Sequence, residues 1–195
     1  MKTVITFTTI LLASMGTLIA QPKNPNHFMM SPFYFLDGTF MLTYERLFQT
    51  GSLRITPSVT LQNLSNHKLI EGHDQREGWS LDAGYKFFLT SRPYKVNFYM
   101  GPYGLFRSLS SYYQTHDYEN GTYRDNTDTY HIVSFGIDGG IKCIFGRFVM
   151  DVSLGGGVRY PYLNGAPFKG SASNVFDVQY KGIVPRGNFS LGVAF

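Results

Sequence analysis

The sequence predicts an all-β protein, an eight-stranded antiparallel up-and-down transmembrane β-barrel, and three observations support this prediction. The composition suits a sheet with many turns, because 16% of the 195 residues are aromatic, 21 are glycine and only 15% are charged. Apolar and polar residues alternate with a period of two through most of the chain. The segments between the alternating stretches are short and long in turn, which is typical of outer-membrane barrels.

Residues 1–20 are predicted to form a secretory signal peptide. Lys2 provides a positive start, an apolar stretch follows, and Ala20 precedes the expected cleavage site. The alternative, an N-terminal membrane anchor, is disfavoured because the apolar stretch is too short to span a bilayer as a helix. We therefore expect an exported protein with a short periplasmic lead at residues 21–26 and an outer-membrane barrel at residues 27–195.

Residues 79–89 show the alternation most clearly, with large apolar residues at the odd positions and mostly polar or small residues at the even ones. The polar positions of such stretches carry isolated charges and glycines, whereas a water-exposed sheet would carry many Lys and Glu. This difference favours a barrel with lipid outside and a polar interior over a soluble sandwich. The same rhythm predicts strands at residues 40–48, 53–62, 95–107, 132–145, 147–160 and 188–195.

The first strand is the least regular. The alternation yields seven strands, whereas barrels of this kind have an even number. We place the eighth at residues 27–36, before a tight turn at Asp37-Gly38. Pro32 implies a kink or bulge there, because proline lacks the N–H that a central strand needs. The alternative is a coil at this position, with the eighth strand at residues 174–184.

Several short sequence landmarks lie in these strands, among them Gly38-Thr39-Phe40, Tyr44-Glu45-Arg46 and Asp138-Gly139-Gly140. With them, residues 28–195 resemble the small outer-membrane β-barrel proteins of Gram-negative bacteria, the class that includes OmpA-type and OmpX-type barrels. The chain is also similar to a narrower barrel family that has no agreed activity. The resemblance implies an outer-membrane location and contact with outer-membrane lipids, and it transfers no catalytic residue.

Charged residues on the polar faces are nearly balanced in sign. Charges inside a narrow lumen are costly unless they are paired and hydrogen-bonded, and eight strands leave room for little more than side chains. We therefore predict a network of ion pairs that fills the lumen. Its expected members are Glu45, Arg54, Asp82, Lys86, Lys95, Arg107, Asp138, Lys142, Asp151 and Arg159.

The last predicted strand carries apolar residues in one phase, and this pattern resembles the terminal signal that the barrel-insertion machinery reads. We expect that machinery to be a partner of the protein. The residues of this assembly signal are Phe189, Leu191, Val193 and Phe195.

The sequence predicts no catalytic, cofactor-binding or metal-binding residues. His131 and Ser134 are three apart, and an odd spacing on a strand places side chains on opposite faces. His67 and His73 in one long loop are too few for a metal site, and a single cysteine excludes a disulfide framework. The net charge of +4 is dispersed, so binding to nucleic acid has no support.

Residues 110–130 form a long segment rich in tyrosine and small polar residues. This composition suits surface recognition of an external ligand, and it also suits a two-stranded extension of the barrel above the membrane. The leading hypothesis is a non-enzymatic barrel with a structural or surface-interaction role. The alternatives are a lipid-modifying enzyme or carrier of a small apolar ligand at the barrel rim, and a narrow ion channel.

Overall fold

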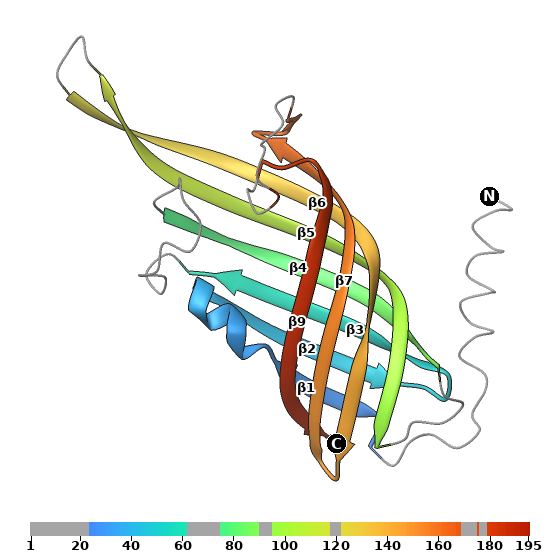
Figure 1. Cartoon of the computed structure of the whole chain (residues 1–195). Coiled ribbons are helices and arrows are strands. Elements are labelled where there is room, and N and C mark those ends of the chain that lie inside the picture. Colours follow the sequence, from blue (N-terminus) through green and yellow to red (C-terminus); the bar gives the residue numbers. More distant parts are fainter. Residues whose placement is uncertain (1–23, 62–74, 90–94, 118–121, 169–174, 176–178) are drawn as a thin grey trace, which may run out of the picture.

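The protein is a closed antiparallel β-barrel in the computed structural model, which describes residues 24–61, 75–89, 95–117, 122–168, 175 and 179–195 (Figure 1). Seven strands, β1 to β7, follow one another around the wall, and β9 closes the barrel by pairing with both β7 and β1. The predicted eight-stranded up-and-down barrel is thus confirmed. The strands are β1 (Asn26–Met30), β2 (Thr39–Leu47), β3 (Gly51–Thr60), β4 (Gln75–Phe88), β5 (Val96–Asp117), β6 (Thr122–Phe145), β7 (Phe148–Leu163), the two-residue β8 (Ala166–Pro167), and β9 (Gly182–Ala194).

The first strand is shorter than predicted. β1 ends at Met30, and residues Pro32–Asp37 form a 3₁₀ helix, η1, so the expectation of a strand over residues 27–36 is wrong for its second half. Pro32 stands in the first turn of η1, where its missing N–H costs no hydrogen bond. Gly38 ends η1 with φ 65°, a left-handed conformation that suits glycine. The alternative strand at residues 174–184 is not needed, since β1 pairs with both β2 and β9.

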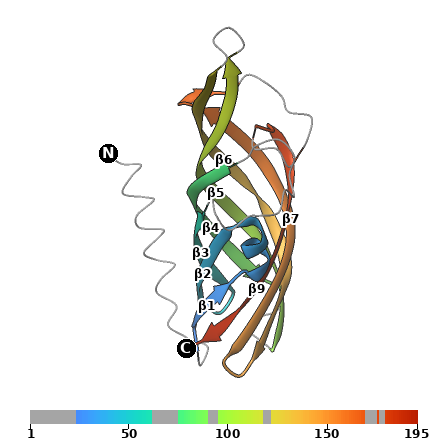
Figure 2. The same cartoon turned by 90° about the vertical axis from the view of Figure 1, so that its left-hand side faces the viewer.

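β5 and β6 extend far beyond the other strands. Their pairing runs from Val96↔Cys143 to Asp117↔Thr122, and the resulting hairpin projects from the end of the barrel opposite the C-terminus (Figure 2). The described part of residues 110–130 thus forms the expected two-stranded extension of the barrel.

The two ends of the barrel differ. At the end that we call the turn end, β2 joins β3 and β6 joins β7 through a few residues, with Gly146 at φ 63°. The C-terminus also lies there (Figures 1 and 2). The other end, the loop end, carries the β5–β6 hairpin. The predicted signal peptide, His67 and His73 lie outside the described residues. Within the described residues, no helix is long and apolar enough to cross a membrane.

The barrel is apolar outside and polar inside. Along β2 and β3 buried and exposed residues alternate almost without interruption. Outward residues such as Trp79 and Phe87 are each 52% exposed, whereas inward residues such as Glu45 and Lys142 are fully buried. Small apolar clusters lie inside near both ends, including Leu47, Phe88 and Tyr99 at the turn end, and Leu109, Tyr130 and Ile132 at the loop end. The polar lumen therefore lies between apolar layers.

Candidate functional site in the barrel lumen

Four charged side chains from four strands meet inside the turn half of the barrel: Glu45 of β2, Lys86 of β4, Lys142 of β6 and Asp151 of β7. We call them the turn-half quartet. The Nζ atom of Lys86 lies 3.0 Å from Oε2 of Glu45 and 2.7 Å from Oδ2 of Asp151. Lys142 pairs with Glu45, and its Nζ is 3.8 Å from Oδ2 of Asp151. Two acids and two bases, all buried, leave this half of the lumen neutral.

Uncharged groups complete the hydrogen bonding of the quartet. Ser52 donates to Oε1 of Glu45 at 2.5 Å, and the Tyr99 hydroxyl donates to Oδ1 of Asp151 at 2.6 Å. The Nζ atom of Lys86 also lies 4.3 Å from the centre of the Tyr99 ring. A buried ion pair offsets its desolvation only when such additional partners are present. The strand alternation brings these groups together, because it turns one residue in two toward the lumen.

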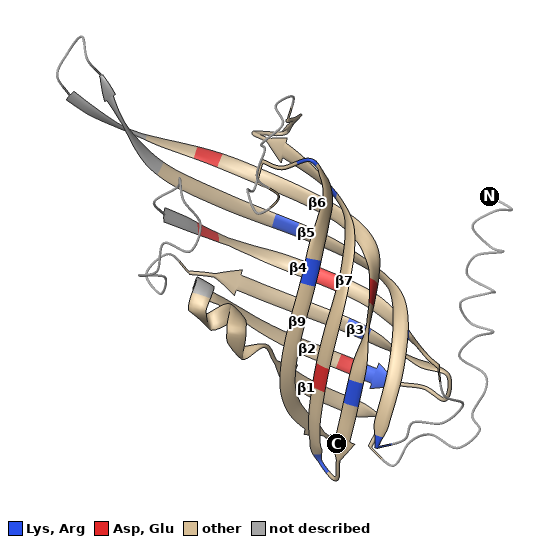
Figure 3. Ribbon diagram, in the orientation of Figure 1, with Lys and Arg blue, Asp and Glu red and all other residues tan. Residues whose placement is uncertain are grey.

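A second group of charges lies closer to the loop end, and we call it the mid-lumen quartet: Arg54, Asp82, Asp138 and Arg186. The Nη2 atom of Arg54 lies 3.2 Å from Oδ1 of Asp82 and 2.9 Å from Oδ2 of Asp138. Arg186 pairs with the other oxygen of Asp82, and its guanidinium lies 4.3 Å from the centre of the Tyr103 ring. This quartet is also neutral, and Figure 3 shows acidic and basic positions following one another along the barrel.

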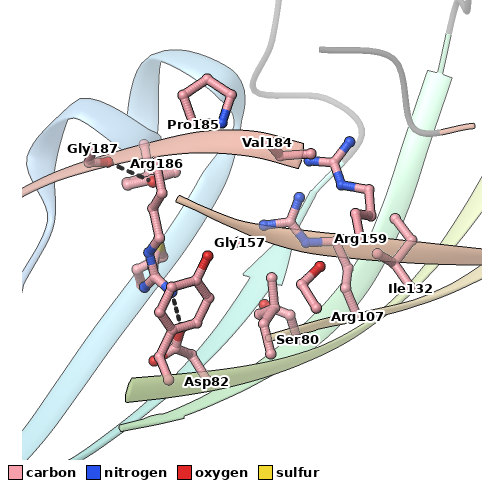
Figure 4. A pocket seen from close by; sticks show the side chains of 15 residues that line it. Ser80, Asp82, Arg107, Ile132, Gly157, Arg159, Val184, Pro185, Arg186 and Gly187 are labelled. Carbon is pink, nitrogen blue, oxygen red and sulfur yellow. Dashed lines mark hydrogen bonds and ion pairs between the residues drawn. The ribbon is translucent and has the colours of Figure 1, made fainter. Parts of the chain in front are cut away.

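A cavity of about 360 Å³ lies above the mid-lumen quartet, toward the loop end. Its lining includes three arginines, Arg107 of β5, Arg159 of β7 and Arg186 of β9, and we call it the arginine cavity. Figure 4 shows the guanidinium groups of Arg107 and Arg159 on one side and Arg186, bonded to Asp82, on the other. Asp82 is the one acid among the described residues of the lining. Among the described residues, this lining carries three positive charges and one negative charge, and Arg107 and Arg159 also interact with other groups of the protein.

Glycines shape the wall around this cavity. The ring of Tyr103 rests on glycines of β6 and β7, since a Cβ on Gly157 would lie 2.6 Å from its hydroxyl oxygen and one on Gly136 would lie 2.8 Å from its ring. A Cβ on Gly155 would lie 2.4 Å from the carbonyl oxygen of Ile137. The run Gly155-Gly156-Gly157 is thus explained in part by close packing, as expected for glycines inside a strand.

The predicted charge network and the observed lumen overlap in most residues. Seven of the ten predicted members take part in the ion pairs of the two quartets, and Arg107 and Arg159 line the cavity. Lys95 differs: it is exposed just before β5 begins, so it lies outside the buried network. The seven are Glu45, Arg54, Asp82, Lys86, Asp138, Lys142 and Asp151.

Arg186 is the charged residue that sequence reasoning missed. The last strand was predicted from residue 188, whereas β9 begins at Gly182. Asn188 and Ser190 point inward, and extending their phase two residues toward the N-terminus reaches Arg186. The residues of the predicted assembly signal lie on the opposite, outer face of β9, where Val193 and Phe195 are exposed and Phe189 and Leu191 are half-buried.

The structure also bears on two other kinds of site, a catalytic His–Ser pair and a metal site. Ser134 points into the lumen, while His131 packs outside against Phe106, with ring centroids 6.1 Å apart, so the odd spacing separates them as predicted. Within the described residues, no group of three or more His, Cys, Asp or Glu side chains is placed to hold a metal ion.

The chain was compared with models of protein families, with curated proteins and with solved structures, and no significant match was found in any of the three. The proposed function therefore rests on the geometry of the barrel itself.

Proposed function

We propose that the protein is an integral outer-membrane β-barrel with a structural or surface-interaction role and no enzymatic activity, its lumen closed in the turn half by paired side chains. One observation carries the proposal: the outer surface is apolar around the whole barrel, while charges are buried and paired inside. Water would not stabilise such a surface, because a soluble monomer rarely exposes a continuous apolar patch of more than a few hundred Å². A bilayer would cover it.

The distribution of exposed aromatic side chains supports the same proposal. Most of them lie toward the two ends of the barrel, where transmembrane barrels place aromatic girdles at the two membrane surfaces, and Phe28, Tyr44 and Phe135 lie between the two groups. Those near the turn end are Phe48, Phe87, Phe98, Phe145, Phe148 and Phe195, and those near the loop end are Phe33, Phe40, Trp79, Phe106 and Tyr160.

The orientation in the membrane follows from the same proposal. The turn end would face the periplasm, and the β5–β6 hairpin would stand outside the cell, available to an external ligand. The outer phase of β9, from Phe189 to Phe195, is our proposed signal for the barrel-insertion machinery. This assignment extends the sequence pattern and agrees with the outward direction of these residues.

Membrane residence can be tested on the full chain expressed in a Gram-negative host. We expect the protein in the outer-membrane fraction, resistant to extraction by alkaline carbonate. Its folded form should migrate differently on gels before and after boiling, because the hydrogen-bonded barrel resists detergent at room temperature. Recovery as a detergent-free soluble monomer in the periplasm would contradict the proposal.

The closed lumen predicts a second result. Purified protein in planar bilayers should show little steady conductance, because paired side chains from β2, β3, β4, β6 and β7 cross the turn half and the middle of the interior. An eight-stranded barrel has an interior just wide enough for side chains. Large, stable channels would contradict a closed lumen and favour the narrow-channel alternative.

A further inference from the structure

The wall of the barrel changes its construction between β9 and β2. β1 pairs with β9 only from His27 to Met30, which lie opposite Ala194 to Leu191. β9 continues past this point to Gly182, and η1 takes the place of a strand beside it (Figure 2). We call the boundary between η1 and residues 182–190 the η1–β9 seam.

Side-chain hydrogen bonds join the two sides of the seam. The hydroxyls of Ser31 and Ser190 lie 2.9 Å apart, and the Tyr34 hydroxyl donates to the carbonyl oxygen of Gly187 at 3.1 Å. Elsewhere in the wall, neighbouring strands are joined by ladders of backbone pairs, for example twelve between β7 and β9. A few side-chain bonds can open at lower cost than such a ladder. The seam is therefore held together less firmly than the neighbouring pairing of β7 with β9.

Two hollows meet at this seam. On the lumen side is the arginine cavity, and on the other is an apolar groove of about 400 Å³ lined by Phe33, Val152, Leu154 and Phe189 among others. Tyr34 and Gly187 line both hollows. The rings of Phe33 and Phe189 lie 5.5 Å apart and border the groove. A molecule that spans the seam would thus touch arginines at one end and apolar side chains at the other.

We propose that this site binds an amphiphile that has one anionic headgroup, a carboxylate or a phosphate, and a long alkyl chain. The headgroup lies in the arginine cavity among Arg107, Arg159 and Arg186, and the chain passes the seam into the apolar groove.

The charge of the cavity lining favours an anionic headgroup. Within the described part of the chain, its lining carries three guanidinium groups against one carboxylate, and the carboxylate of Asp82 pairs with both Arg54 and Arg186. A guanidinium group binds a carboxylate or a phosphate through two parallel hydrogen bonds. A cationic headgroup would be repelled by the arginines, and a neutral one would form weaker hydrogen bonds with them than an anion does.

The size of the two hollows selects an amphiphile over a free anion. The arginine cavity is near the lower end of the range of about 300–1,000 Å³ that is usual for small-molecule sites, so it suits a headgroup better than a whole lipid. A chain would bury its surface in the adjoining groove. Lateral entry of the ligand depends on the proposed membrane location, whereas binding itself can be measured in detergent.

The test measures binding to the full-length protein in detergent micelles by native mass spectrometry, with three probes: hexadecanoate, hexadecan-1-ol and inorganic phosphate. We expect hexadecanoate to bind at least about tenfold more tightly than the alcohol, since its carboxylate forms ion-paired hydrogen bonds with the arginines, whereas the hydroxyl forms only weaker ones. Free phosphate should bind more weakly than hexadecanoate. Equal binding of hexadecanoate and the alcohol, or no binding of hexadecanoate, would overturn the proposal.

Two variants separate the headgroup from the chain. Arg107→Gln/Arg159→Gln removes two charges, and we expect it to weaken hexadecanoate binding by about tenfold or more. Its control is Arg147→Gln at the exposed turn end, which should leave binding unchanged. Gly187→Leu places a side chain where the two hollows meet, and a Cβ there makes an ordinary contact, 3.4 Å from the end of the Leu154 side chain.

Gly187→Leu should weaken the binding of hexadecanoate and leave the weaker phosphate binding unchanged, because Gly187 shares the outward phase of Phe189 and its added side chain is directed into the groove. Gly104→Leu is its control, since a Cβ at Gly104 also has room, 3.6 Å from the Phe135 ring.

Each variant must keep the gel shift on boiling that marks the folded barrel. Should a variant lose that shift, the comparison of hexadecanoate with the alcohol in the unmodified protein still decides the proposal. The proposal would be overturned if phosphate bound as tightly as hexadecanoate and Gly187→Leu did not weaken phosphate binding, because the site would then bind free anions. A soluble protein that still bound hexadecanoate would contradict the membrane location and leave the site standing.

Discussion

Replacing Glu45 with alanine is expected to lower the free energy of unfolding by about 3–5 kcal/mol, the range for removing one partner of a buried ion pair. Glu45 is fully buried and accepts from Lys86, Lys142 and Ser52. Without it, two buried lysines share Asp151 alone, and one positive charge in the turn half is left uncompensated.

The measurement is urea unfolding of the folded barrel in detergent or lipid vesicles, followed by the fluorescence of Trp79. This is the single tryptophan of the chain, and it lies on the outer surface. Glu77→Ala is the matched control, because Glu77 is exposed on β4 and surface changes usually stay within about 0.5 kcal/mol. A cost for Glu45→Ala no greater than that of the control would contradict a stabilising role of the turn-half quartet.

A double variant isolates the pair itself. Glu45→Ala/Lys142→Met removes one charge of each sign and leaves Lys86 bonded to Asp151 at 2.7 Å. It should cost less than the sum of the two single changes, because the residues are in direct contact. Strict additivity would mean that the two charges do not stabilise each other.

Asp138 gives a useful contrast within the same lumen. Its carboxylate accepts from Arg54, but Arg54 also bonds to Asp82 at 3.2 Å. Removing Asp138 leaves Arg54 and Arg186 to share Asp82, but the Arg186 side chain is 16% exposed, so water can solvate the uncompensated charge, and we expect a smaller loss of stability than for Glu45. The charged residues of the lumen thus differ in their expected contribution to stability, although the sequence pattern places all of them on the inward face of their strands.

The strand period explains why so much of the lumen was predictable. A period of two assigns every residue of a strand to the inner or the outer face, so the seven paired residues were identified without any knowledge of contacts. The period does not show which charged residues pair with one another, because pairing depends on the strand register and on closure of the barrel. Arg54 and Asp138, for example, are 84 residues apart and reach each other across the lumen from β3 and β6.

Lys95, Arg186 and the η1 helix were not predicted correctly, and each error has a local cause. Lys95 has the correct phase but lies where β5 has not yet begun, and phase alone does not show where a strand enters the buried zone. Arg186 was missed because Pro185 and Gly187 interrupt the pattern on either side of it. The η1 helix was missed because the apolar residues after Pro32 read equally well as a strand, and a short apolar run does not distinguish the two.

Replacing Gly101 with alanine is expected to have the second large effect. Gly101 lies in β5 at a close approach to β4, where an added Cβ would stand 1.8 Å from the carbonyl oxygen of Tyr85 and 3.1 Å from the Cα of Lys86. Both are backbone atoms and cannot rotate away. Backbone pairing between these strands is also interrupted here, running up to Gly84↔Tyr103 and resuming at Phe87↔Met100.

The expected cost of Gly101→Ala is about 1–3 kcal/mol or more, the usual range for overpacking, and urea unfolding measures it. Gly104→Ala is the matched control in the same strand, because the nearest atom to its added Cβ is a ring carbon of Phe135 at 3.6 Å. That change should be neutral or stabilise the barrel by about 0.5–1 kcal/mol, since alanine loses less backbone freedom on folding than glycine does.

The effect of Gly101→Ala should also reach the charged lumen. To accept the methyl group, β4 must shift at Tyr85 and Lys86, and Lys86 holds Glu45 at 3.0 Å and Asp151 at 2.7 Å. A variant carrying both Gly101→Ala and Glu45→Ala should therefore lose less stability than the sum of the single losses, because the first change already weakens the contacts that the second removes. Equal losses for Gly101→Ala and Gly104→Ala would instead show that β4 and β5 separate easily, and that their close approach does not position the turn-half quartet.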